Sequence, residues 1–141
     1  MSVQAAHDQI AAARGRLPRE TIEGAVRAFE ATYARKDWET RAALLSQDAV
    51  FEDTVGVPPP AIGRQAAADY FRLIIASGWN VEMRPRQIIV MGDEAFVITD
   101  GQWGVEGEAP VKLMLIQNFK FNENGEICHV RIAYDEGCIM S

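Results

Sequence analysis

The sequence predicts an α+β fold in which helices come first and a mostly antiparallel sheet follows. Residues with helical periodicity occupy the first half, and apolar strands separated by turn residues occupy the second half. A chain of 141 residues is long enough to bury a core and too short for two domains. We therefore expect a lead-in helix within residues 1–17 and a single domain over 18–141, with three to four helices wrapped around a curved sheet.

Helical periodicity is clearest after Pro18, which is a favoured first-turn residue. Ile22, Val26, Phe29 and Tyr33 recur every three or four residues, so they share one face of a helix that should end near residue 36. The other expected helices span 5–16, a short segment with Asp37 as its N-cap, and 65–76.

The second half contains four apolar strand segments, at 81–91, 95–103, 111–121 and 127–134. Glycine-containing turns separate them, and the Asn122–Gly125 turn is a strong hairpin signal. Ahead of these strands, Ala49–Asp53 reads as a short strand that ends in two adjacent carboxylates and then breaks at Gly56.

Composition excludes several classes of function. The formal net charge of −6 and the lack of a Lys/Arg cluster argue against nucleic acid or an anionic membrane as partner. His7 and His129 are far apart, and no glycine-rich phosphate loop is present, so an enzyme here would need no metal or other cofactor. With only Cys128 and Cys138, a reduced cytoplasmic protein is the simple expectation.

Asp53 is the leading candidate for chemistry. A carboxylate at the end of an apolar strand cannot be fully solvated, and desolvation raises its pKa toward the range in which a general base works. The plainer alternative is that Asp53 caps the following turn.

The order of elements and four motifs resemble the NTF2-like superfamily, in particular its ketosteroid isomerase and SnoaL-like branch. The motifs are Tyr33–Trp38, Phe51–Gly56, Gly63-Arg64 and Ile116–Asn122, and the resemblance covers everything after Pro18. It implies a cone-shaped pocket between the helices and the sheet. This fold hosts isomerases, cyclases, dehydratases, lyases and non-catalytic binders, so the resemblance leaves the function open.

Ketosteroid isomerases use an Asp base, a Tyr and a protonated Asp, and the base matches Asp53. The tyrosine falls on Phe29 and the protonated Asp on Gln117, so a true steroid isomerase is not expected. Tyr33, one turn beyond Phe29, can supply the missing hydroxyl. If the family register holds, Asp100 also faces inward as a second acid/base group; otherwise it is a solvated charge.

Strand alternation extends this set to a pocket lining. The side chains expected to contact a substrate are Phe29, Phe51, Val55, Tyr70, Ile98, Gln102, Leu115, Val130, Ile132 and Tyr134. The opposite sheet face is expected to form a homodimer, as the family often does, with Met114, Ile116, Asn118, Lys120, His129 and Arg131 on it.

The sequence thus indicates a cofactor-independent acid/base enzyme of the isomerase, cyclase or lyase type, acting on a hydrophobic, ring-containing small molecule. Asp53 would transfer the proton, while Tyr33 and Gln117 would hold an oxygen. One alternative within this class is a carbon–carbon lyase that releases a small aldehyde from an aromatic diol. The competing class is a non-catalytic binding or dimerisation module. Convergence of Asp53 with Tyr33, Gln117 or Asp100 on one cavity would favour the enzyme.

Overall fold

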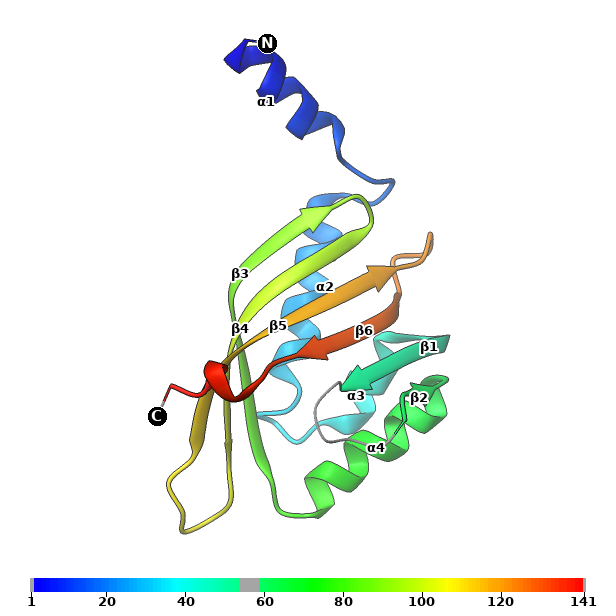
Figure 1. Cartoon of the computed structure of the whole chain (residues 1–141). Coiled ribbons are helices and arrows are strands. Elements are labelled where there is room, and N and C mark those ends of the chain that lie inside the picture. Colours follow the sequence, from blue (N-terminus) through cyan, green and yellow to red (C-terminus); the bar gives the residue numbers. More distant parts are fainter. Residues whose placement is uncertain (1, 54–58, 141) are drawn as a thin grey trace.

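A computed structural model describes residues 2–53 and 59–140 of the chain (Figure 1). Within these residues the helices are α1 (Val3–Ala12), α2 (Arg19–Ala31), α3 (Trp38–Ala43) and α4 (Arg64–Ala76), followed near the C-terminus by a 3-10 turn, η1 (Glu136–Cys138). The strands are β1 (Leu45–Asp53), β2 (Ala61–Ile62), β3 (Asn80–Met91), β4 (Glu94–Gly104), β5 (Val111–Phe121) and β6 (Ile127–Ala133).

The strands form one curved sheet in the order β2-β1-β6-β5-β4-β3, with the helices of the main body on one side (Figure 1). Strands β1 and β6 pair in parallel, and the other described pairs are antiparallel. This confirms the predicted α+β cone with a mostly antiparallel sheet. In the parallel register Asp53 lies opposite Ile132, so the end of β1 meets the end of β6.

Helix α2 packs its apolar stripe across the inner face of the sheet. Ile22, Val26 and Phe29 are fully buried, and the Phe29 ring meets Phe119 of β5 edge to face at 5.6 Å between centroids. Burying a side chain of this size stabilises the fold by roughly 1.5–3 kcal/mol. The helix ends earlier than expected, because residues 32–36 form a turn in which Lys36 takes a left-handed φ of 56°.

Asp37 begins α3 as predicted, because its Oδ1 accepts a hydrogen bond from Thr40 N at 3.1 Å. The helix buries Arg41 and Ala42 against the core. Helix α4 follows β2 and buries Phe71, whose ring lies 4.9 Å from Phe51 of β1. Helices α3 and α4 therefore close the cone around the end of β1.

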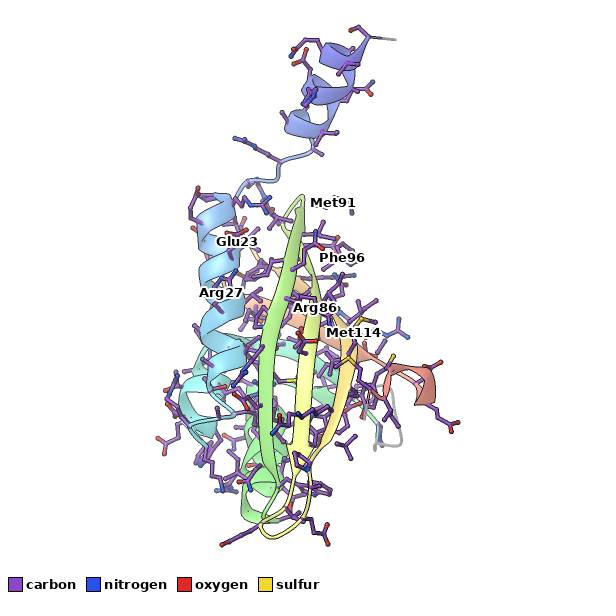
Figure 2. The ribbon with its side chains drawn as sticks, turned by 90° about the vertical axis from the view of Figure 1, so that its left-hand side faces the viewer. Glu23, Arg27, Arg86, Met91, Phe96 and Met114 are labelled. Atoms are coloured by element: carbon purple, nitrogen blue, oxygen red, sulfur yellow. The ribbon has the colours of Figure 1, made fainter. Side chains whose placement is uncertain are left out.

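The alternation of β4 is the reverse of the predicted one, so the expectation that Asp100, Ile98 and Gln102 line the pocket is wrong. Asp100 instead pairs with Arg86 of β3. Figure 2 shows Phe96 and Met114, from β4 and β5, on the side of the sheet away from α2. The inward residues are Ala95, Val97, Thr99 and Gly101.

The reason for this error lies in the composition of β4. Apolar residues occupy both of its faces, so the two-residue period gave no usable signal. Gly101 shows which face is packed, because a Cβ there would lie 3.2 Å from Leu115 Cδ2.

Helix α1 stands away from the sheet and buries none of its residues (Figure 1). The segment after it is held on the β3–β4 turn, where Asp93 Oδ1 accepts a hydrogen bond from Leu17 N at 3.0 Å. Gly92 N also donates to Ala13 O at 3.0 Å. No helix in the described part of the chain combines the length and apolar character that a membrane crossing requires.

Candidate active site

A pocket of about 390 Å³ lies where the ends of β1 and β6 approach α4 and the start of β3. It gathers all three tyrosines of the chain and two of its three tryptophans. Asp53 is the one charged residue among the described residues that line it. The full lining is Tyr33, Asp53, Tyr70, Ile74, Trp79, Val81, Trp103 and Tyr134. A pocket this size, walled by rings, suits a small molecule with one or two rings.

Asp53 ends β1 opposite Ile132 of β6, and Tyr134, which follows β6, lies with Asp53 at the pocket wall. The two side chains share a hydrogen bond, and burial together with the Asp53 charge raises the pKa of Tyr134 to about 12. The Tyr134 ring is in turn fixed by an edge contact with Trp103, at 4.9 Å between centroids. Asp53 is half-buried, and the Tyr134 hydroxyl that donates to it is neutral at ordinary pH.

Tyr33 and Tyr70 supply two further phenols. Burial raises the pKa of Tyr33, with Arg41 opposing the shift and Asp53 adding to it. Burial also raises the pKa of Tyr70, helped by the neighbouring Tyr33. All three tyrosines of the pocket are therefore protonated at neutral pH and able to donate hydrogen bonds. The site holds one carboxylate acceptor among several neutral donors.

The structure brings together four of the predicted site residues: Asp53, Tyr33, Tyr70 and Tyr134. Five others do not line this pocket and instead fill the cone beneath it; these are Phe29, Phe51, Leu115, Val130 and Ile132, each at most 3% exposed. They were expected to touch a substrate, but all five belong to the buried core, where Phe29 and Phe51 each pack edge to face on Phe71. Val55 lies outside the described residues.

Gln117 faces inward as predicted, but it is fully buried and is not among the side chains of this pocket. Its Oε1 accepts a hydrogen bond from Thr99 Oγ1 at 2.8 Å, and its Nε2 donates to Glu30 Oε1 at 3.0 Å. The amide is thus engaged within the protein and serves to hold Glu30.

Sequence reasoning missed two buried charged residues below the pocket, Glu30 and Arg41. Burial raises the pKa of Glu30 to about 7, against the opposing effects of Arg41 and Gln117. A signal for Glu30 was present, because it follows Val26 by four residues on the apolar face of α2. Arg41 gave no such signal, because a long basic side chain on a short helix usually extends into solvent.

Residues 26–130 match the SnoaL-like domain family. The chain belongs to this family. A comparison with curated protein sequences found no significant match.

Solved structures show the same NTF2-like fold as this SnoaL-like protein. An LEH-like epoxide hydrolase from M. tuberculosis is 23% identical, with a TM-score of 0.72 over 85% of this chain and 86% of its own. SalBIII, an epoxide hydrolase/cyclase-like enzyme of pyran ring formation in salinomycin, is 18% identical, with a TM-score of 0.73 over 85% and 95%.

A third structure, RV0760c from Mycobacterium tuberculosis in complex with estradiol-17beta-hemisuccinate, is 18% identical, with a TM-score of 0.74 over 86% and 98%. At these identities the likeness establishes the fold, and the function has to be argued from the site.

Two tryptophans of the SnoaL-like pocket were not predicted to contact a ligand. Trp103 faces inward, and its Nε1 is buried without a hydrogen-bond partner among the described residues. Trp79 lies at the rim, 44% exposed. Across residues 2–53 and 59–140, no three His, Cys, Asp or Glu side chains gather where they could hold a metal ion.

Proposed function

We propose that this SnoaL-like protein is a cofactor-independent acid/base enzyme acting on a hydrophobic, ring-containing small molecule. The observation that carries the proposal is the convergence of Asp53 with Tyr33 on one pocket walled by aromatic rings. A single carboxylate facing neutral phenols can accept a proton while the phenols stabilise negative charge on a substrate oxygen. Asp53 would be the proton-transfer base, with Tyr33 and Tyr70 as donors.

Several reactions need only a proton-transfer base and a hydrogen-bond donor for an oxygen. Double-bond isomerisation, aldol-type ring closure, its reverse and dehydration each need one base and one or two donors. Epoxide opening, suggested by the names of two structural relatives, needs a base for the attacking oxygen and a donor for the ring oxygen. Carbon–carbon cleavage of an aromatic diol, releasing a small aldehyde, falls within the same class.

One observation favours a second candidate, a non-catalytic binding module. The interior of the cone is filled by its own side chains, including Phe29, Phe51 and Phe71, so the cavity is confined to the mouth. A relative of this fold has been solved with a bound steroid ester, and another is a designed 17-OHP binder. A binder would hold its ligand against the same rings without needing Asp53 as a base.

Asp53→Asn separates the two candidates in a substrate screen with ketosteroids, polyketide-like aromatics and lignin-type aromatic diols. An enzyme should lose kcat by about two to four orders of magnitude, the usual contribution of a positioned proton-transfer group. Binding should survive, because the amide is nearly isosteric. Asp100→Asn is the matched control, because Asp100 pairs with Arg86 on the outer face and should not affect turnover.

A substrate-free measurement tests the same residue. Carboxyl-carbon NMR should find that Asp53 titrates above the ordinary aspartate value of roughly 3.9, because desolvation by its aromatic walls should outweigh the hydrogen bond from Tyr134. Full activity of Asp53→Asn, or titration of Asp53 near or below the ordinary value, would favour the non-catalytic binding module over the enzyme.

A further inference from the structure

Arg41 is a fully buried cation that pairs directly with no carboxylate of residues 2–53 and 59–140. Its Nη1 donates to two uncharged oxygens, Phe29 O at 2.9 Å and Thr32 Oγ1 at 3.3 Å. Its Nε and Nη2 make no hydrogen bond of normal geometry among the described residues, although the guanidinium also interacts with the Tyr33 hydroxyl. Burying a charge without hydrogen-bond partners costs free energy, so we expect such a charge to be retained where it contributes to function.

Aromatic rings take the place of a counter-ion around the guanidinium. Its central carbon lies 3.7 Å from the centroid of the Phe29 ring, 3.9 Å from Tyr33 and 4.6 Å from Phe71. Such contacts hold a cation without neutralising it. Tyr33 lines the pocket and its ring lies against Arg41, so a ligand at the Tyr33 hydroxyl is close to a buried positive charge that a protonated Glu30 leaves without a counter-ion.

We propose that Arg41 gives this pocket a preference for a ring compound whose oxygen is, or becomes, negatively charged, bound at the Tyr33 hydroxyl. This rests on the proposed function and narrows its substrate class to carbonyl, phenol or carboxylate compounds. The pocket then has two poles: the Asp53–Tyr134 pair accepts a proton, and Tyr33 backed by Arg41 receives the negative oxygen. Arg41 is a positioning residue that acts through Tyr33.

Glu30 provides a way to vary the charge of Arg41 without removing it. Burial raises the pKa of Glu30 to about 7, so its carboxyl group gains a negative charge as pH rises through neutrality. The charged or titratable groups that act on Glu30 are Arg41 of α3 and Tyr33 of the turn that follows α2. From β5 it meets uncharged Gln117, and the buried side chains of β3 and β4 opposite α2 are uncharged as well. An ionised Glu30 would offset Arg41 and weaken the attraction for an anion.

Two probes of nearly equal shape, 2-naphthoate and 2-naphthamide, test the charge preference by isothermal titration calorimetry at pH 6. The ratio of their dissociation constants cancels packing effects common to both. The wild type should favour the anion, and Arg41→Met should reduce that preference at least about tenfold. Arg41→Lys should retain part of it. Arg72→Met is the matched control, because Arg72 also lies over a ring, that of Trp38, but is exposed to solvent.

A pH series adds a measurement whose result should not change if Arg41 and Glu30 have only a structural role. The wild-type preference for naphthoate should fall as pH rises from about 6 to about 8, and Glu30→Gln, which keeps Arg41, should abolish this fall. This pH series tests the inference even if Arg41→Met fails to fold.

Three results would overturn the inference: equal binding of both probes, no naphthoate binding by the wild type, or a pH dependence unchanged in Glu30→Gln. In each of these cases Asp53→Asn can still abolish turnover, so failure of this inference is distinguishable from failure of the proposed function.

Discussion

The buried carboxyl group of Glu30 should make the stability of this protein fall with rising pH. Its pKa rises from an ordinary 4.5 in the unfolded chain to about 7 in the fold, chiefly through burial. Between these values the folded protein keeps a proton that the unfolded chain has released, so stability decreases as pH rises and levels off above about 7. The full shift corresponds to about 3 kcal/mol, most of it lost between about pH 5 and about pH 8.

Glu30→Gln isolates this effect, because the amide cannot ionise and its oxygen can still accept the hydrogen bond from Gln117 Nε2. The assay is urea unfolding at a series of pH values, followed by circular dichroism. The difference in unfolding free energy between Glu30→Gln and the wild type should shift by about 2–3 kcal/mol in favour of the variant from about pH 5 to about pH 8.

Glu23→Gln serves as the control, because Glu23 lies on the same helix but pairs with Arg19 near the surface. It should follow the wild-type curve. A Glu30→Gln curve parallel to that of the wild type, or wild-type stability that rises over this range, would refute the reasoning.

Three further predictions concern the pocket, the outer sheet face and the N-terminal segment. Tyr33→Phe should lower kcat by about 10- to 100-fold, less than Asp53→Asn, because it removes one hydrogen bond to a developing charge; equal losses would contradict the assigned roles. The outer sheet face, where Ile116 is 48% exposed and His129 contacts Glu52 at 2.6 Å, should form a homodimer. Light scattering should give a dimer mass at micromolar concentration, and a monomer mass would count against it. Asp93→Ala should speed tryptic cleavage at Arg14 and Arg16 without changing Tm, because Asp93 holds Leu17 N; unchanged cleavage would show that other contacts hold this segment.

The sequence by itself determined the class of the fold and the position of the principal carboxylate. The apolar stripe from Ile22 to Tyr33, the Asp37 cap and the Asn122–Gly125 turn are local signals, each set by the conformational preferences of a few neighbouring residues. The meeting of Asp53 with Tyr33 on one pocket was also predictable, because Asp53 ends a strand and Tyr33 follows a helix that the family motifs place beside it.

Only the tertiary structure decided which face each residue of β4 presents and how polar groups are shared inside the cone. Both faces of β4 are apolar, so the register with β5, and not the strand's own pattern, turned Asp100 outward. The burial of Glu30 and Arg41 depends on rings and amides from other elements, including Phe71 of α4 and Gln117 of β5. Such contacts join residues far apart in sequence, so no local sequence pattern indicates the interactions that stabilise Glu30 and Arg41 in the interior.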